Sequence, residues 1–147
     1  MKPENEIIKQ LEEQNIEYEL LQDEYLPSKK SELNKVIKIW IDRFIGKHSA
    51  PNLENYLWHI FSKGATDSLE GEDAVKELKS QYDTDTLIFN EPQQYLIKCK
   101  AKIPLIEMED FLDDIYISHH NMKWTFVIPH ETPEIGPFFS CGIKSEK

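Results

Sequence analysis

The chain has few cysteines, few glycines and no long apolar run, and each shortage excludes a class of protein. Its two cysteines, Cys99 and Cys141, are too few for the disulfide framework of a small secreted domain. Its five glycines are scattered, so no glycine-rich loop is present to cradle a phosphate. No apolar stretch approaches the roughly 20 residues of a membrane-spanning helix, and the first residues lack a signal peptide's apolar core. We therefore expect a cytoplasmic location, with both cysteines free and buried in strands.

Positive charge is also scarce, which bears on the choice of partner. The chain has 17 Lys and Arg against 27 Asp and Glu, so its net charge is −10 at pH 7. Nucleic acid and anionic membranes are bound through clustered Lys and Arg, so we expect neither as a partner. An acidic surface steers association toward positively charged molecules. The composition therefore favours a basic protein partner.

What the chain does contain is enough apolar material for one core. It has 147 residues, of which 39% are hydrophobic and 11% aromatic. A chain of this length buries roughly 70% of its unfolded surface without needing disulfides or metals. No internal repeat, linker or low-complexity tract divides it. We predict one globular domain over residues 1–147.

Apolar spacing predicts the elements of the first half. A short helix begins near Pro3 and ends at Asn15, and a half-exposed strand follows over residues 16–20. The clearest helix starts after Ser31 and ends at Gly46. Its apolar stripe consists of Leu33, Val36, Ile37, Trp40, Ile41 and Phe44. Residues 53–61 fit either a helix or an aromatic central strand, and we favour the strand.

The second half reads mostly as hairpins. After a polar turn region at 64–71 and a helix at about 72–81, strands at 84–90 and 94–100 form a hairpin. Pro104 opens a short helix, and alternating strands at 115–117 and 124–128 enclose a turn. Gly136-Pro137 then returns the chain into a last strand at 138–142. Helices before hairpins favour an α+β fold: a mostly antiparallel sheet of about five to seven strands, with three to four helices packed mainly on one face.

The histidines do not form a metal site in this arrangement. His119 and His120 lie at the turn, whereas His130 lies at the far end of the returning strand, more than about 20 Å away. His130-Glu131 superficially resembles a zinc-protease helix, but that motif needs a second histidine four residues after the first. Glu134 occupies that position, so the match is rejected. We expect no metal and no cofactor.

His130 and Glu131 remain candidates for acid–base chemistry, although a structural role at the strand end is favoured. His59, between two large apolar residues, is interpreted first as a hydrogen-bonded core or sheet-face histidine. No nucleophile motif of the Gly-x-Ser-x-Gly type is present. Five acids lie on a predicted outward face, with a contact patch for a basic protein as the second interpretation: Glu107, Glu109, Asp110, Asp113 and Asp114.

Several aromatic motifs resemble a known bacterial family. They are Tyr56 to Ser62, Leu69 to Ala74, Trp124 to Val127, His130-Glu131 and Gly136 to Phe139. Together they resemble domain of unknown function 4275, from about Lys30 onward. Pro129 and Phe138 depart from that pattern, which would have Thr and Tyr there. The resemblance implies a compact cytoplasmic domain and supplies no activity.

Two functions remain open from the sequence. The first is a small acidic protein-binding domain without catalysis, immunity-like or regulatory, that acts on a basic partner. The second is a small-molecule ligand-binding domain or an enzyme that uses His130 and Glu131. The candidate binding residues are His59, Trp124, His130 and Glu131. No catalytic residue is assigned.

Overall fold

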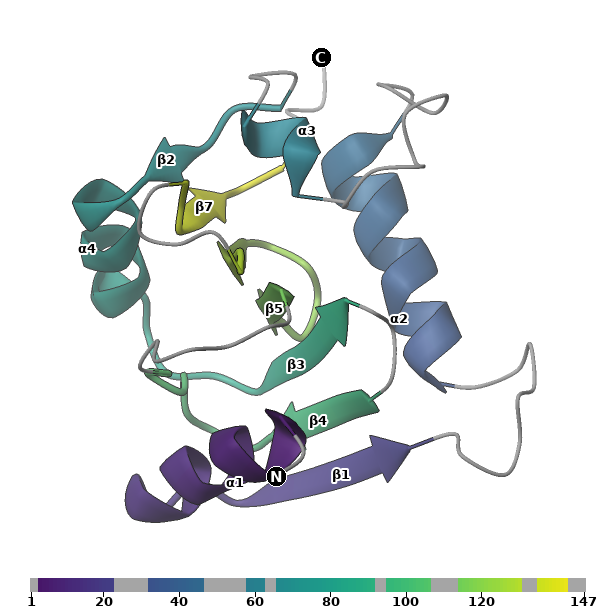
Figure 1. Ribbon diagram of the computed structural model, residues 1–147, viewed down its shortest axis with the longest axis vertical. Helices are drawn as coiled ribbons and strands as arrows, with labels where there is room; N and C mark the ends of the chain where they lie inside the picture. Colours follow the sequence, from purple (N-terminus) through teal and green to yellow (C-terminus); the bar gives the residue numbers. More distant parts are fainter. Residues whose placement is uncertain are drawn as a thin grey trace.

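A computed structural model describes residues 3–22, 32–46, 58–62, 66–91, 95–106, 114–130 and 135–142. These residues build one seven-stranded antiparallel sheet in the order β1-β4-β3-β5-β6-β7-β2 (Figure 1). The strands are β1 (Tyr18–Gln22), β2 (Leu69–Glu70), β3 (Thr86–Glu91), β4 (Tyr95–Cys99), β5 (Asp114–His119), β6 (Thr125–Ile128) and β7 (Phe138–Ser140). The predicted α+β fold and strand number are confirmed.

Three helices of nine or more residues and one shorter helix accompany the sheet in the described ranges. They are α1 (Pro3–Glu13), α2 (Glu32–Trp40), α3 (His59–Ser62) and α4 (Glu72–Ser80), and α2 continues into the π-helical turn η1 (Ile41–Ile45). The predicted helix ends are confirmed: Asn15 has φ 57° and Gly46 has φ 58°. None of these helices combines the length and apolar character needed to cross a membrane.

The helices cover both faces of the sheet, which differs from the expected packing mainly on one face. α1 and α4 pack on one face, whereas α2, η1 and α3 pack on the other (Figure 1). The reason is that the central strands are apolar on both faces, so each face needs a cover. All six residues of β5 and all four residues of β6 are buried.

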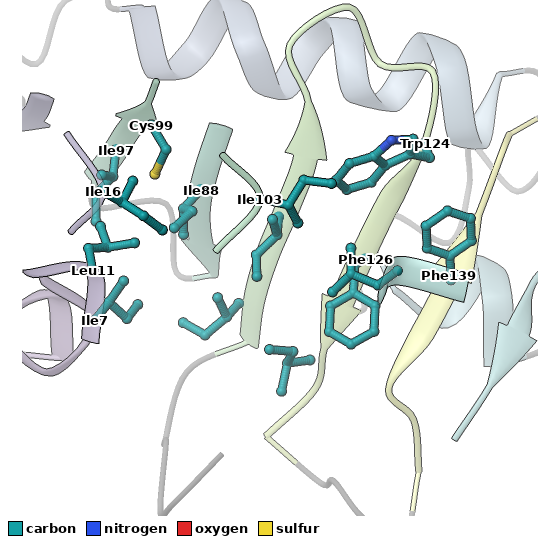
Figure 2. Close-up of a cluster of buried hydrophobic side chains, with 14 of the residues drawn as sticks. Ile7, Leu11, Ile16, Ile88, Ile97, Cys99, Ile103, Trp124, Phe126 and Phe139 are labelled. Atoms are coloured by element: carbon teal, nitrogen blue, oxygen red, sulfur yellow. The ribbon is translucent and has the colours of Figure 1, made fainter. Parts of the chain in front are cut away.

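Each face of the sheet forms its own hydrophobic core. The α1-side core joins Ile7 and Leu11 of α1 to the isoleucines of the central strands and to Trp124, Phe126 and Phe139 (Figure 2). The α2-side core joins Trp40 and Phe44 to the opposite faces of the same strands. Odd-numbered residues of β5 therefore face α1, and even-numbered residues face α2.

Four local predictions are corrected by the structure. Residues 59–61 are helical rather than strand, because Trp58 and Phe61, three residues apart, both pack on Phe138. Leu69–Glu70, predicted as turn, pairs with β7. Pro104 opens no helix through Ile106, and residues 107–113 lie outside the described ranges. Cys99 is buried in β4 as expected, but Cys141 follows β7 and is exposed.

Candidate functional site

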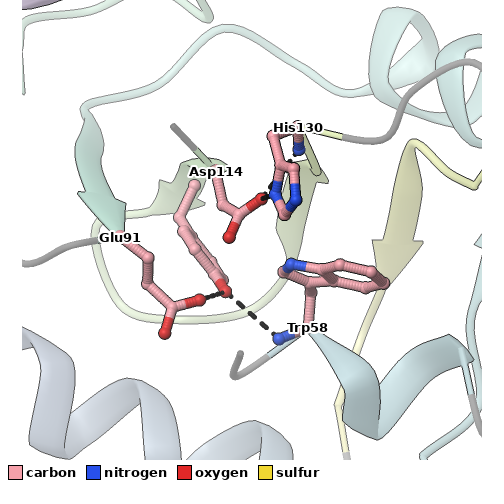
Figure 3. Close-up of polar contacts among 5 residues, drawn as sticks. Trp58, Glu91, Asp114 and His130 are labelled. Carbon is pink, nitrogen blue, oxygen red and sulfur yellow. Dashed lines mark hydrogen bonds and ion pairs between the residues drawn. The ribbon is translucent and has the colours of Figure 1, made fainter. Parts of the chain in front are cut away.

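A polar cluster lies where three neighbouring strands end on the α2 side of the sheet. Glu91 is the last residue of β3, and Asp114, its direct cross-strand partner, is the first residue of β5. His130 follows β6 by two residues, and Trp58 immediately precedes α3. Figure 3 shows the side chains of Asp114 and His130 turned toward each other, with Trp58 beside them. Antiparallel pairing brings these distant sequence positions to one end of the sheet.

Asp114 and His130 form the centre of this cluster. Asp114 Oδ1 accepts a hydrogen bond from the backbone N–H of His130 at 2.7 Å and lies 2.7 Å from its ring Nδ1. The Asp114 side chain is 1% exposed, whereas the His130 side chain is 31% exposed. When the imidazole is neutral, donation of the Nδ1 proton to Asp114 makes Nε2 its acceptor nitrogen. A buried carboxylate therefore fixes the tautomer and orientation of a ring that solvent reaches.

The second oxygen of the same carboxylate has no hydrogen-bond partner among the described residues. Asp114 Oδ2 is fully buried and makes no hydrogen bond with any described residue. A buried carboxylate oxygen normally has a donor, because desolvating it without one costs free energy. A bound molecule with an N–H or O–H group would supply the donor that this oxygen needs.

Tyr116 links the other members of the cluster. Its hydroxyl donates to Glu91 Oε1 and accepts the backbone N–H of Trp58 at 3.1 Å. Burial, followed by the nearby charges of Glu91 and Asp114, raises the pKa of Tyr116 well above its usual value of 10.0. The hydroxyl therefore stays protonated and holds α3 against the sheet.

Aromatic rings enclose the polar groups. Trp58 meets the His130 ring edge-on at a centroid distance of 6.4 Å and stacks on Phe138 at 6.2 Å. Phe89 stacks on Tyr116 at 4.8 Å. This apolar surround lowers the local dielectric, so hydrogen bonds and charges in the cluster act more strongly than in water.

The turn into β7 lies next to these aromatic rings, and glycine is required in it. Gly136 has φ +85°, and a Cβ at this position would lie 2.7 Å from Pro129 Cδ. Its N–H donates to Glu70 Oε2 at 3.1 Å, and Gly71 N–H donates to Pro137 O at 2.8 Å. The predicted return at Gly136-Pro137 therefore also anchors the edge strand β2.

The predicted site residues do not all gather here. His130 lies in the cluster. Trp124 is buried in the α1-side core, where it stacks on Phe139 at 5.7 Å, so it lies on the opposite face of the sheet. His59 begins α3 beside Trp58, but its side chain is outside the described part of the structure. Glu131 also lies outside the described residues.

The remaining paired histidines occupy the other end of the sheet. His119 ends β5, and His120 stacks on it with ring centroids 4.4 Å apart. Burial, with the charges of His120 and Lys123, lowers the pKa of His119. Within the described ranges, no group of three His, Cys, Asp or Glu side chains is arranged to hold a metal ion.

Sequence reasoning missed Asp114, Glu91 and Tyr116 as site residues. Asp114 was expected on a solvated face because four further acids precede it closely, yet it opens a fully buried strand. The available signal was its position directly before the alternating run Ile115 to Ile117. An acid in that position belongs to the strand rather than to the charged segment before it.

The fold and cluster define an α+β domain in which a buried aspartate holds a partly exposed histidine at the ends of the central strands. The chain belongs to the family described as domain of unknown function DUF4275, whose family model matches residues 6–139. No curated protein and no solved structure matches the chain. Segments that carried the family resemblance meet at the cluster: Trp58 contacts both His130 and Phe138.

Proposed function

We propose that this domain binds a small polar molecule at the Asp114–His130 pair, with His130 as the residue that exchanges a proton or hydrogen bond with it. The observation that carries the proposal is the 2.7 Å contact between a buried carboxylate and a partly exposed imidazole. An aspartate at Nδ1 orients the ring and stabilises the positive charge that it gains on accepting a proton.

The unpartnered oxygen of Asp114 adds a second requirement for the ligand. A molecule that reaches the pair should offer a hydrogen-bond donor, because no described residue donates to Asp114 Oδ2. Glu91 and Asp114 face each other across β3 and β5, so the site carries an excess of negative charge. A neutral or cationic polar molecule with an N–H or O–H group fits these features better than an anion does.

Ligand-observed NMR with a library of small polar metabolites tests this function. His130→Asn retains a donor near the Nδ1 position and removes Nε2, so binding should weaken at least tenfold. His120→Asn, the same change at an exposed histidine at the other end of β5, is the matched control and should leave binding unchanged. Ligands that bind both variants equally, or a library without any ligand, would overturn the proposal.

A second function is favoured by the net charge of −10: binding of a basic protein, in a regulatory or immunity-like role and without catalysis. We propose the cytoplasm of a bacterium as the setting, consistent with the family resemblance. A pull-down at low salt should recover one specific basic protein, and its affinity should fall steeply as salt is raised. Recovery of no such protein would count against this function.

A further inference from the structure

We infer that the outer edge of β1 is a docking site for an extended segment of a basic partner protein, added to the sheet as an eighth strand. This inference rests on the second proposed function and names its contact surface. β1 is the first strand of the sheet order, and no described strand pairs with its outer side (Figure 1). An open strand edge presents backbone donors and acceptors to another chain.

The register of β1 shows which backbone groups face outward. Lys100 N–H donates to Glu17 O at 2.9 Å, and Tyr18 pairs with Cys99 one position further. Hydrogen-bonded pairs alternate along an antiparallel ladder, so Glu17, Glu19 and Leu21 direct their backbone groups to β4. The N–H and C=O groups of Tyr18, Leu20 and Gln22 therefore point away from the sheet, where a new strand can bond to them.

The two faces of this edge differ in chemistry. Tyr18 and Leu20 are half-buried and pack against the α1-side core, so the neighbouring residues of an added strand should be apolar. Glu17 and Glu19 are exposed on the opposite face. Residues opposite them would occupy the closely spaced pairs of the new ladder, where opposite charges stabilise pairing. The fitting segment alternates basic and apolar residues.

A concavity beside this edge has room for the basic side chains. A cavity of about 460 Å³ is lined by Glu17, Glu19, Asp85, Leu87, Lys98 and Lys100, among others. The lysines there already have carboxylate partners: Lys98 lies 2.5 Å from Glu32, and Lys100 lies 3.4 Å from Glu17. The Lys100–Glu17 pair is exposed and therefore weak, so Glu17 is able to exchange partners.

Charge also argues against a second copy of this chain as the occupant. An antiparallel β1–β1 pair would bring the Glu17 and Glu19 carboxylates of both copies onto one face. Like charges across a strand pair are destabilising, and natural edge strands use them to prevent self-association. The exposed carboxylates therefore select a basic partner and disfavour a homodimer through this edge.

The test is a titration of the ¹⁵N-labelled full chain with a short synthetic peptide in which lysine and valine alternate, at low salt. We expect the largest amide shifts at Tyr18, Leu20 and Gln22. Gln22→Pro removes one outward donor without touching the bonds to β4, and it should weaken binding at least tenfold. Gln22→Ala is the matched control and should bind like the unaltered chain.

Two further comparisons distinguish strand pairing at the β1 edge from nonspecific attraction of a basic peptide to an acidic protein. A peptide of the same composition with lysines and valines in separate blocks should bind at least tenfold more weakly. Glu19→Lys should weaken binding at least threefold more than Asp67→Lys, which changes net charge equally near the far edge strand β2. These comparisons carry the test if Gln22→Pro fails to fold.

The outcomes distinguish docking at the β1 edge from the second proposed function, binding of a basic protein. One outcome is that both peptides bind equally and that Glu19→Lys and Asp67→Lys weaken binding equally. That result would refute docking at the β1 edge but would remain consistent with binding of a basic partner elsewhere. If neither peptide binds, docking at the β1 edge is refuted. The pull-down and its salt dependence then test binding of a basic partner separately.

Discussion

Asp114 gives the cluster its chemical character, because it is a carboxylate in a fully buried strand. Its cross-strand neighbour is another acid, Glu91, so two negative charges meet where apolar residues would pack more easily. Tyr116 and His130 offset this by hydrogen bonding to one carboxylate each. A polar network of this kind stabilises the fold only while each member keeps its partners.

Tyr116→Phe should reveal the structural part of this network. The change leaves the buried N–H of Trp58 without its acceptor, which costs about 1–3 kcal/mol of unfolding free energy. Tyr18→Phe makes the same change at an exposed hydroxyl bound to Glu12 and should stay within about 0.5 kcal/mol. Urea unfolding of both variants measures the difference. Equal losses would show that the Tyr116 hydroxyl has no special role.

The two cysteines should react very differently. Burial raises the pKa of the Cys99 thiol to about 12, so at pH 8 only about one molecule in ten thousand carries the thiolate. Cys141 is exposed. A thiol reagent such as Ellman's reagent should therefore modify one thiol quickly in the folded protein and two after unfolding. Cys141→Ser should remove the fast reaction, and a fast reaction that persists would contradict the burial of Cys99.

At the scale of elements, the turn into β7 depends on a residue without a side chain. Gly136 and Gly71 both have positive φ, but only Gly136 has a neighbour within 3 Å of the position that a Cβ would take. The two glycines therefore separate backbone strain from steric crowding.

Gly71→Ala should lower the unfolding free energy by about 1–3 kcal/mol through strain. Gly136→Ala should cost a further 1–3 kcal/mol or so, because the new methyl group collides with Pro129. Chemical denaturation midpoints compare the two variants. A Gly136→Ala variant no less stable than Gly71→Ala would contradict the close approach.

The element predictions succeeded where the apolar period was long and regular. The stripe from Leu33 to Phe44 predicts a helix, and α2 with η1 confirms it. The short run around Trp58 to Phe61 was misjudged, because four or five apolar residues suit a strand and a helical turn equally. Contact with Phe138, distant in sequence, selects the helix.

At the scale of the whole molecule, one sheet separates two cores. Tyr116 and Val127 show why. Tyr116 lies between Ile115 and Ile117 in β5, and Val127 lies between Phe126 and Ile128 in β6. These neighbours face the α1-side core, whereas Tyr116 and Val127 are apolar and face the α2-side core, so both faces require cover. The sequence contained this signal, but the alternation was interpreted as one apolar face.

Because both cores share the sheet, they should unfold together. Trp124 lies in the α1-side core, whereas Trp40 and Trp58 lie in the α2-side core. In a Trp124→Phe variant, fluorescence reports only the α2 side, and its urea midpoint should equal the midpoint from far-ultraviolet circular dichroism. Separate midpoints would contradict the prediction of a single domain over residues 1–147.

The sequence by itself determined the fold class, most strands and helices, the acidic character and His130 as a candidate. These features depend on local periodicity, composition and turn residues, which act over a few positions. Only the tertiary structure decided that Asp114 is buried against His130, that Trp124 lies on the other face, and that β1 is the last strand on its side of the described sheet. Those outcomes depend on strand order and register, which place residues far apart in the chain at one end of a sheet.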